Sequence, residues 1–451
     1  MWRLHPFAGR EFFLDSVHTT GDADGRAGVG YVELLRRNRD FRLVWLGQVV
    51  SQLGDWLNTI AIYTLVLGLT GSSGAAVGLV LVARFLPSVV LGPLAGVIAD
   101  RFSRRTVMIV SDLLRALVVL GFLLVESPEQ LWLVYALTVA QLALSTFFEP
   151  ARTAAIPSIV AERELVAANA ISSVTWSAML TLGAAVGGEI TTLFGVRASF
   201  VVDSLTYLLS ALLIASVRLP PRPARPPRRL SLARALGLSD TLEGMRYVWR
   251  RPRVLALLLV KPAWGLGGGI LALLAVFGER VFPVGGSTAR GISILYAARG
   301  IGTAVGPFVA RRLAGQTRAR MQRAIGLSFL VGGAFYVWFG LSTNFLVALL
   351  VLATAHAGGS VLWMFSTVLL QQTVEDDFRG RVFAAEIMLF TLTMAASNYL
   401  TGVGLDRFGY SPRAVAVAIG LFFFLPGLLW LLTRRWWDRE GTDAPRTRLA
   451  P

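Results

Sequence analysis

Apolar stretches of about 20 residues recur along almost the whole chain, and they constrain its fold more than any other feature. About 20 apolar residues in a helix cross the ~30 Å hydrocarbon core of a bilayer. Within lipid, the backbone polar groups are satisfied only in helices or in a closed barrel. The pattern therefore predicts an all-α integral membrane protein with twelve transmembrane helices. The expected spans are 43–70, 75–98, 106–125, 130–148, 170–193, 198–217, 254–277, 291–313, 323–342, 345–370, 382–404 and 413–433.

The composition agrees with a membrane protein and argues against several other classes. Of the 451 residues, 55% are hydrophobic and 16% are charged, whereas soluble domains have about 25% charged residues. The net charge of +16 alone would suit a nucleic-acid-binding protein, but such a surface does not require so apolar a chain. With no cysteine and only three histidines, no metal site is expected. Lys261 is the only lysine and is followed by Pro262, so no ATP-binding P-loop is present.

The arginines are distributed unevenly between the connections. If the N-terminus is placed inside, the inside connections hold most of them, including a dense run at 218–253, and the outside ones hold few. Cytoplasmic loops carry an excess of Lys and Arg. We therefore expect a multi-pass protein of the inner (plasma) membrane, with both termini in the cytoplasm.

The segment 218–253 is the longest connection and divides the spans into two groups of six. It opens with prolines among arginines, which is typical of an extended linker. Asp240 and Glu243 then form a helix-start pattern, which predicts an interfacial helix on the anionic inner leaflet. The expected organisation is a cytoplasmic tail at 1–40, a six-helix bundle at 41–217, this linker at 218–253, a second six-helix bundle at 254–434 and a cytoplasmic tail at 435–451.

The two groups of six show traces of an internal repeat at an offset of about 214 residues. Gly92-Pro93 matches Gly306-Pro307, Gly188 matches Gly402, and Phe194-Gly195 matches Phe408-Gly409. Because six is an even number, both groups enter the membrane from the same side. The spans are therefore expected to form two parallel repeats related by an axis along the membrane normal.

The connection after the second span carries a recognisable motif. Its sequence, from Gly96 through Asp100 and Arg101 to Arg104 and Arg105, resembles the G-x-x-x-D-R-x-G-R-R signature of the major facilitator superfamily, with Ser103 in place of the glycine. Inside positive charge alone would explain the arginines but not the spacing of glycine and aspartate. The resemblance implies a conformational latch at Gly96, Asp100, Arg101, Arg104 and Arg105, in which the carboxylate faces a helix N-terminus.

Other segments also resemble this superfamily. Gly183, Gly187 and Gly188 stand where its antiporter motif has G-P-x-x-G-G, with Ala184 in place of proline, and small residues of this kind suit close helix packing. The segments 51–56, 148–152 and 371–381 are similar to the branch that contains macrolide-efflux proteins and the enterobactin exporter. The resemblance extends over 41–434 and implies that spans 1, 4, 7 and 10 line a central cavity.

Charges at membrane depth are costly, so each is a functional hypothesis. Asp55 lies about 12 residues into the first span, or ~18 Å along a helix, near the midplane. We expect Asp55 and Arg84, at similar depth in the second span, to carry proton coupling. A permanent structural ion pair between them is the alternative, and Arg299, at the position related to Arg84, is expected to be a brace or part of the same machinery.

Polar stripes run along the first, fourth and tenth spans, and Lys261 and Trp264 stand among glycines in the seventh. For Lys261 the alternative is a side chain that extends to the membrane surface, and for His356 it is a packing role. The expected substrate-cavity residues are Gln48, Gln52, Thr59, Gln141, Lys261, Trp264, His356, Ser360 and Trp363.

The other charges within or near the spans have simpler interpretations. Asp112 and Arg115 are three residues apart and are expected to neutralise each other. Asp203 and Glu189 stand near the outer ends of their spans and are expected to reach water. Glu149 and Glu386 stand near inner ends, where solvation is also the favoured interpretation.

Together these features predict a secondary active transporter: a proton-coupled antiporter that exports apolar or amphipathic molecules of drug, macrolide or siderophore type by alternating access. Proton-coupled uptake of a metabolite, a lipid flippase and a non-transporting membrane protein are the alternatives. No enzymatic activity, cofactor or nucleic-acid partner is expected. The expected partners are a small-molecule substrate, protons and the lipid bilayer, and the chain is expected to be a monomer.

Overall fold

The computed structural model describes residues 30–219, 245–314 and 317–439. Within these ranges the chain forms helices and short connections, with one isolated antiparallel bridge between Val284 and Ser287. Eleven helical segments of the described residues are long and apolar enough to cross a membrane. One of them contains two of the expected spans, so the prediction of twelve membrane passes is confirmed.

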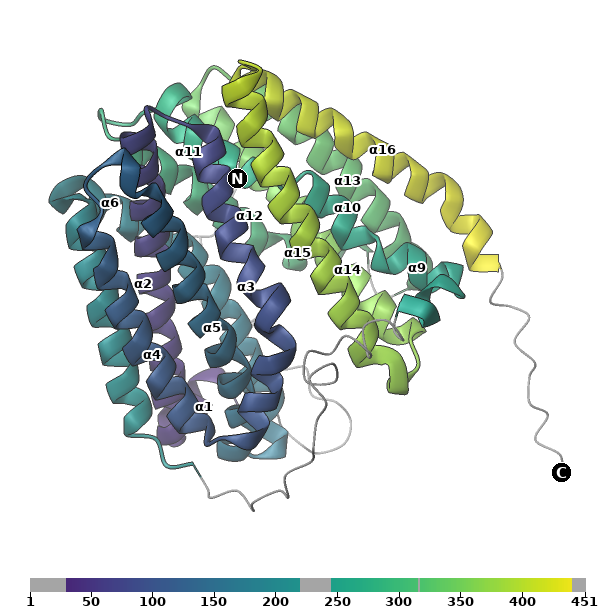
Figure 1. The fold of residues 1–451 in the computed structure, drawn as a ribbon. Coiled ribbons are helices and arrows are strands. Elements are labelled where there is room, and N and C mark those ends of the chain that lie inside the picture. The colour runs from purple at the N-terminus through teal and green to yellow at the C-terminus, as the bar shows by residue number, and fades with distance from the viewer. Residues whose placement is uncertain (1–29, 220–244, 315–316, 440–451) are drawn as a thin grey trace, which may run out of the picture.

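The first six passes lie in one half of the molecule (Figure 1), here called the N-half. Short 3-10 turns at Gly121–Leu124, Pro128–Gln130 and Glu162–Glu164 join its helices. The helices are α1 (Tyr31–Arg37), α2 (Arg39–Thr70), α3 (Gly74–Arg101), α4 (Arg104–Leu120), α5 (Leu131–Ile159) and α6 (Leu165–Ala215).

The fifth and sixth passes are both contained in α6 and are separated at Gly195. This glycine has φ 81° and ψ 168°, a conformation that a side chain would make unfavourable. The Thr191 and Ser199 hydroxyls, on either side of the glycine, lie 2.8 Å apart. Gly409, the repeat partner of Gly195, also has a positive φ, of 64°. The internal repeat thus places a glycine with a positive φ at both turns.

The last six passes form the C-half. Its helices are α9 (Pro252–Leu258), α10 (Val260–Leu266), α11 (Ile270–Val276) with a π-turn at Phe277–Val281, α12 (Thr288–Ala314), α13 (Arg318–Leu341), α14 (Phe345–Thr373), α15 (Asp376–Arg407) and α16 (Pro412–Arg439).

The seventh pass is broken between α10 and α11, where three glycines at 267–269 follow one another. Two side chains of α15 bind the backbone groups that the break leaves free. The Ser397 hydroxyl accepts a hydrogen bond from Gly269 N and donates one to Leu266 O, and Asn398 Oδ1 accepts from Ala272 N. The break is therefore stabilised by the neighbouring helix.

The two halves meet along two seams, α3 with α15 and α6 with α12. Figure 1 shows them converging at the top, at the α2–α3 and α15–α16 connections, and diverging towards the bottom. We call the top the closed end. We call the bottom the linker end, because the described chain stops there at residue 219 and resumes at residue 245. At the closed end the helices touch closely: a Cβ on Gly78 of α3 would lie 2.7 Å from Asn398 O of α15. Further along α3, Cβ atoms on Gly92 and Gly96 would meet nothing within 4 Å.

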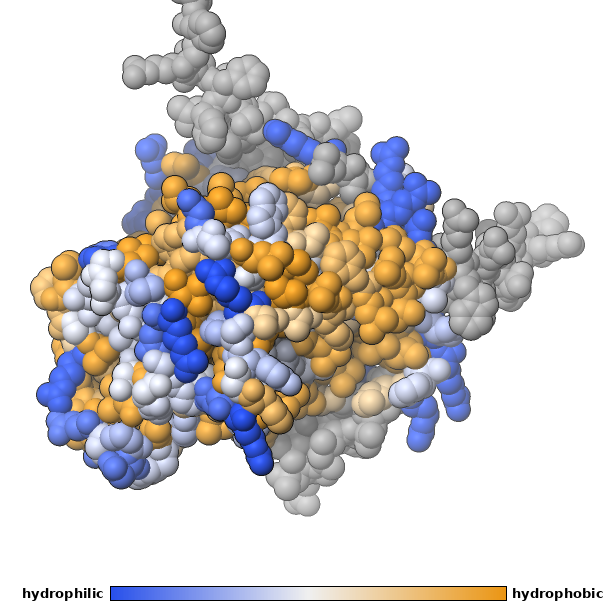
Figure 2. Space-filling model, turned by 90° about the horizontal axis from the view of Figure 1, so that it is seen from above, coloured by the Kyte–Doolittle hydropathy of each residue, from blue (hydrophilic) through white to orange (hydrophobic). Residues whose placement is uncertain are grey.

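The outer surface agrees with a lipid environment. Figure 2, which looks onto the closed end, shows polar residues over the left and centre and apolar residues over the right-hand flank. Large apolar side chains of the C-half, such as Leu428 and Leu432 of α16, are strongly exposed. Such a surface is stable only against lipid or another apolar partner.

The structure describes only parts of the predicted linker and tails. The expected helix start at Asp240 and the tail at 1–29 lie outside the described residues. Residues 245–249 are helical, and the Tyr247 ring stacks on Phe378 of the C-half with centroids 4.2 Å apart. Within the expected N-terminal tail, residues 31–37 form α1, whose Leu34 packs with Phe41 and Ile156 in a small core.

Candidate functional site

A polar network lies in the interior of the N-half, around Asp203 on the second arm of α6. Its carboxylate accepts a hydrogen bond from Asn58 Nδ2 of α2 at 2.7 Å. Asn58 also contacts Gln141 of α5, whose amide donates to the Tyr207 hydroxyl at 2.9 Å. Tyr207 in turn donates to Asp55 of α2. Asp55 and Asp203, from two helices, are thus joined through a continuous chain of hydrogen bonds.

The network continues to a buried ion pair on α4. Arg115 and Asp112 form a direct salt bridge, with side chains 1% and 0% exposed. The Arg115 guanidinium also lies 4.3 Å from the Tyr207 ring centroid and 4.6 Å from that of Phe148, at cation–π distance. The expected pairing of Asp112 with Arg115 is confirmed, and aromatic faces complete the surroundings of the cation.

The charges in this network do not balance. Three carboxylates (Asp55, Asp112 and Asp203) share one guanidinium, so the fully ionised cluster would carry a net charge of −2 at membrane depth. Asp112 and Asp203 are fully buried, and uncompensated charge is strongly disfavoured there. Asp55 is partly exposed. The arrangement therefore favours a proton held among the carboxylates, with Asp55 as the member that reaches solvent.

Several sequence-based expectations for this half require correction. No hydrogen bond or ion pair joins Asp55 to Arg84 in the described parts of the chain, because Tyr207 occupies the place beside Asp55. Asp203 was expected at a wet helix end but is fully buried, because it follows the Gly195 turn by about two helical turns. The spacing of Asp203 and Tyr207, one turn apart in an apolar helix, was the overlooked signal.

The polar stripe of α2 is also divided between different roles. Gln48 is buried and accepts a hydrogen bond from Arg152 Nη1 at 2.9 Å. The Thr59 hydroxyl donates to Asp55 O within its own helix. Gln52 is partly exposed and Gln141 is buried in the network. Of the four predicted cavity residues on this side, only Gln52 is partly exposed, and Gln48, Thr59 and Gln141 are buried.

The C-half contains a separate buried ion pair. Lys261 Nζ of α10 lies 2.7 Å from Glu386 Oε2 of α15, with side chains 2% and 0% exposed. The Trp363 ring centroid lies 4.5 Å from the ammonium. Glu386 was expected at a solvated end, and this is wrong because Lys261 binds it inside the bundle. The remaining carboxylate oxygen, Oε1, is buried without a hydrogen-bond partner among the described residues.

The other predicted residues of the C-half mostly pack within it. The Trp264 ring stacks on Phe423 at 4.5 Å and fills the space beside Gly332 and Gly359. His356 is buried, with Nε2 3.2 Å from the Tyr336 hydroxyl. The Ser360 hydroxyl donates to Ala357 O, where α12 approaches at Gly306. Trp363 remains 38% exposed.

Aromatic residues join the halves between these two networks. Tyr296 of α12 lies 5.8 Å from Tyr63 and 6.1 Å from Trp56, both of α2, measured between ring centroids. Tyr63 and Tyr296 are almost fully buried. Arg299 lies 5.9 Å from the Tyr296 ring, and Arg84 is within electrostatic range of both tyrosine hydroxyls. Arg84 and Arg299 are thus both within range of this aromatic cluster.

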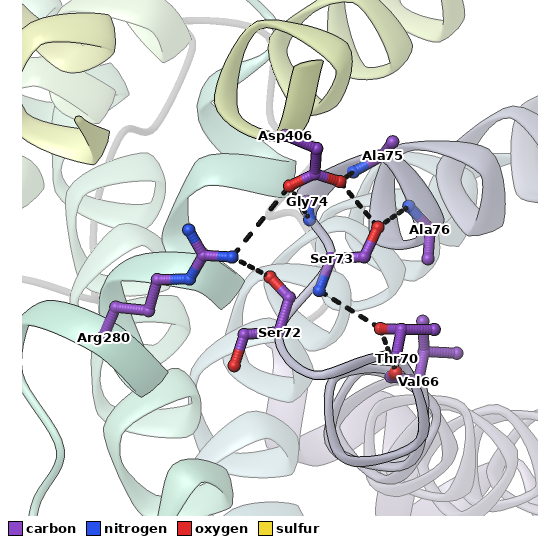
Figure 3. Close-up of polar contacts among 9 residues, drawn as sticks. All are labelled: Val66, Thr70, Ser72, Ser73, Gly74, Ala75, Ala76, Arg280 and Asp406. Carbon is purple, nitrogen blue, oxygen red and sulfur yellow. Dashed lines mark hydrogen bonds and ion pairs between the residues drawn. The ribbon is translucent and has the colours of Figure 1, made fainter. Parts of the chain in front are cut away.

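A carboxylate clamp closes the α3–α15 seam at the closed end (Figure 3). Asp406, at the end of α15, accepts hydrogen bonds from the Ser73 hydroxyl at 2.6 Å, Gly74 N at 3.0 Å and Ala75 N at 2.8 Å. These groups form the N-terminus of α3, where a negative charge is stabilising. Arg280 donates to Ser72 O and lies 3.9 Å from the same carboxylate.

The α6–α12 seam has an equivalent clamp of different chemistry. The Thr192 and Ser287 hydroxyls lie 2.7 Å apart, and at the repeat offset of 214 residues they correspond to Asp406 and Ser73. Beside them, Arg290 makes two hydrogen bonds of 2.8 Å to Glu189. The repeat therefore closes both seams at the same end of the molecule.

Sequence comparison identifies the family. The model of the Major Facilitator Superfamily matches residues 44–386, which is more than half of the chain. The chain is a member of the major facilitator superfamily. It is therefore a multi-pass membrane transporter of small molecules rather than an enzyme.

Relatives and solved structures agree with this assignment. The chain is 27% identical over 410 residues to an MFS-type transporter, YfiS, of Bacillus subtilis, covering 89% of this chain and 95% of the relative. It is 25% identical to macrolide efflux protein A of Streptococcus pyogenes, covering 82% and 90%. The same fold is found in a bacterial homologue of the human lysosomal transporter Spinster, solved in an inward-facing and unoccupied conformation. The TM-score is 0.69 at 16% sequence identity, and the match covers 89% of this chain and 98% of that structure.

The superfamily signature lies at the linker end, between α3 and α4. Ser103 caps α4 by accepting from Thr106 N. Arg104 donates to Ala154 O and, at 2.8 Å, to the Ser158 hydroxyl, and Arg105 donates to Ala215 O. These contacts bind the signature to α5 and α6 of its own half. Arg101 is exposed, Gly96 has no close neighbour, and the Asp100 side chain lies outside the described part of the structure.

The glycines of the antiporter-like segment make close helix contacts. A Cβ on Gly183 would lie 2.9 Å from Trp56 Cβ, and one on Gly187 would lie 2.9 Å from Leu57 Cα. Gly188 instead faces α12, where a Cβ would overlap the Ser293 side chain. Small residues at these positions allow α6 to approach α2 through Gly183 and Gly187, and α12 of the C-half through Gly188.

No group of three or more His, Cys, Asp or Glu side chains is arranged to hold a metal ion in residues 30–219, 245–314 and 317–439.

Proposed function

We propose that this major facilitator is a proton-coupled exporter of amphipathic small molecules that works by alternating access. Its similarity to macrolide efflux protein A supports export. The observation that carries proton coupling is the charge imbalance of the N-half network, where three linked carboxylates share a single arginine.

The coupling residues in this proposal are Asp55 and Asp203. Asp55 is the partly exposed member of the network, and the Asn58, Gln141 and Tyr207 side chains connect it to buried Asp203. A proton taken up at Asp55 reduces the net negative charge of the cluster, which favours a state in which the site is shut off from water. Releasing that proton restores the charge and favours the hydrated state.

The linker end is proposed to face the cytoplasm, because the arginine-rich connections lie there and positive charge is retained inside. The structure then corresponds to an inward-facing state, with Asp406 and Thr192 closing the outer side. In the outward-facing state the signature aspartate Asp100 would take the corresponding role at the N-terminus of α15, so that each end has its own clamp. The chain is proposed to act as a monomer in the plasma membrane, with the halves bounded as predicted.

The test uses purified protein in proteoliposomes and whole cells. A susceptibility panel of macrolides, dyes and siderophores, with and without expression, selects the transported compound. Gradient-driven transport of that compound is then measured across an imposed pH difference. Transport that is insensitive to the gradient would contradict proton coupling, and an unchanged panel would contradict export.

A further inference from the structure

Arg84 and Arg299 carry positive charge at the middle of the membrane. Arg84 lies ten residues after the first residue of α3, and Arg299 eleven residues after the first residue of α12. At 1.5 Å per residue these positions are about 15 Å and about 16 Å along their helices, roughly half of a ~30 Å hydrocarbon core. The two helices occupy repeat-related places, so each half supplies one arginine to the same depth.

Neither guanidinium is paired with a carboxylate in the part of the chain that the structure describes. Among the described residues, no ion pair or side-chain hydrogen bond joins Arg84 or Arg299 to a partner, and Arg299 Nε is buried without an acceptor. The four carboxylates at membrane depth are used elsewhere: Asp55, Asp112 and Asp203 in the N-half network and Glu386 with Lys261.

The surroundings of the two arginines are aromatic. Both arginines are within electrostatic range of Tyr63 and Tyr296. The Arg299 guanidinium lies 5.9 Å from the Tyr296 ring, and Trp56 packs against Tyr296. On its other side Arg299 is within electrostatic range of Tyr336 and His356. Arg84, Arg299 and Trp56 are all partly exposed, and the contacts of Tyr296 with Trp56 and Tyr63 place this group where the two halves meet. Aromatic faces and unpaired guanidinium groups together match a molecule with a flat apolar body and an acidic group.

We propose that Arg84 and Arg299 bind the acidic group of the transported molecule, and that the substrates of this protein are amphipathic organic anions. This inference rests on the proposed export function and names its substrate class. A carboxylate, sulfonate or phosphate placed between the halves would supply the missing counter-charge to both guanidinium groups. The apolar body would lie against Trp56 and Tyr296. Because the arginines come from opposite halves, the bound anion would contact both moving parts.

The competing explanation is that the arginines brace the tyrosines. A brace stabilises the fold whatever the ligand, so its removal affects neutral and acidic ligands alike. An anion site discriminates between a carboxylate and a matched neutral molecule, because an unpaired charge attracts only the former. The ratio of the two affinities therefore separates the explanations.

The experiment compares pyrenebutanoate with pyrenebutanol, which share an aromatic body and differ in the acidic group. Binding to the protein in nanodiscs is followed by energy transfer from tryptophan to pyrene, with empty nanodiscs as background. The wild type should bind the acid at least 10-fold more tightly than the alcohol. Arg84→Gln and Arg299→Gln should each weaken binding of the acid by roughly 10- to 100-fold, the value of a hydrogen bond to a charged group, and leave binding of the alcohol unchanged.

Three further variants control the measurement. Arg163→Gln removes an exposed arginine of the Glu162–Glu164 turn and should change neither affinity. Arg84→Lys and Arg299→Lys keep the charge and should retain part of the preference for the acid, which also covers the case of a Gln variant that fails to fold.

Equal affinity of the wild type for acid and alcohol would overturn the inference, and so would Gln variants that lose both ligands in parallel. Binding is measured at equilibrium without a gradient. A preserved preference for the acid together with absent transport would therefore contradict the proposed export function and leave the anion site standing.

Discussion

Removing the Asp406 carboxylate should shift the protein towards the state in which the closed end is open. In Asp406→Ala, the amides of Gly74 and Ala75 and the Ser73 hydroxyl lose their acceptor, and Arg280 loses its nearby counter-charge. Water at this end of the bundle replaces part of the lost hydrogen bonding. The net loss is therefore that of a charged helix N-cap, roughly 1–2 kcal/mol.

This stabilisation is lost only from the state in which the α3–α15 seam is closed. In the open state the two halves are separated at this seam, so the Asp406 contacts are absent there in any case. Since every 1.4 kcal/mol is tenfold in an equilibrium, the ratio of open to closed should rise about 5- to 30-fold. The natural chain has no cysteine, so spin labels can be attached specifically at Glu129→Cys and Thr343→Cys, two exposed positions at the closed end. Pulsed electron resonance then gives the populations of short and long distances.

Glu33→Ala is the control, because it removes an exposed carboxylate that pairs with Arg37 of its own helix, α1. Its distance distribution should equal that of the wild type. If Asp406→Ala also leaves the distribution unchanged, the carboxylate does not hold the seam, and the assignment of the clamp is refuted.

Three further predictions concern stability. Arg115→Leu leaves Asp112 buried and unpaired and should lower the free energy of unfolding by roughly 3–5 kcal/mol, which is measured as a lower thermal unfolding midpoint. The double variant Asp112→Leu with Arg115→Leu should recover most of this loss. A double variant as unstable as the single one would contradict the prediction. Gly187→Ala brings a Cβ to 2.9 Å from Leu57 Cα and should lower the free energy of unfolding by roughly 1–3 kcal/mol. Gly68→Ala places a Cβ that meets nothing within 4 Å and should raise the free energy of unfolding by up to about 1 kcal/mol. Glu189→Gln breaks a pair with side chains 51% and 27% exposed and should change stability by less than about 1 kcal/mol; a larger loss would mean that this pair, rather than Asp406, holds the closed end.

The fold was accessible from the sequence because it depends on segment length and hydrophobicity. The twelve passes and the parallel repeat followed from these properties. The repeat-related glycines Gly195 and Gly409 both have a positive φ. The contact of Asp112 with Arg115 was also predictable, because one helical turn joins them.

The partners of Asp55, Lys261 and Glu386 were not predictable in the same way. Each depends on how one helix is rotated against another, and hydropathy is too uniform along these spans to fix that rotation. Arg84 matched Asp55 in depth, but depth says nothing of direction around the helix axis. Glu386 lies early in α15 and was therefore placed at a wet end, although α10 approaches there with Lys261.

The central claim, proton coupling through the N-half carboxylates, is tested most directly by gradient-driven transport in proteoliposomes. Asp55→Asn and Asp203→Asn should abolish accumulation of the transported compound across an imposed pH difference, while exchange of that compound without a gradient continues. Glu149→Gln, which changes a half-exposed carboxylate outside the network, should behave as the wild type. Accumulation at the wild-type level in both aspartate variants would contradict the account.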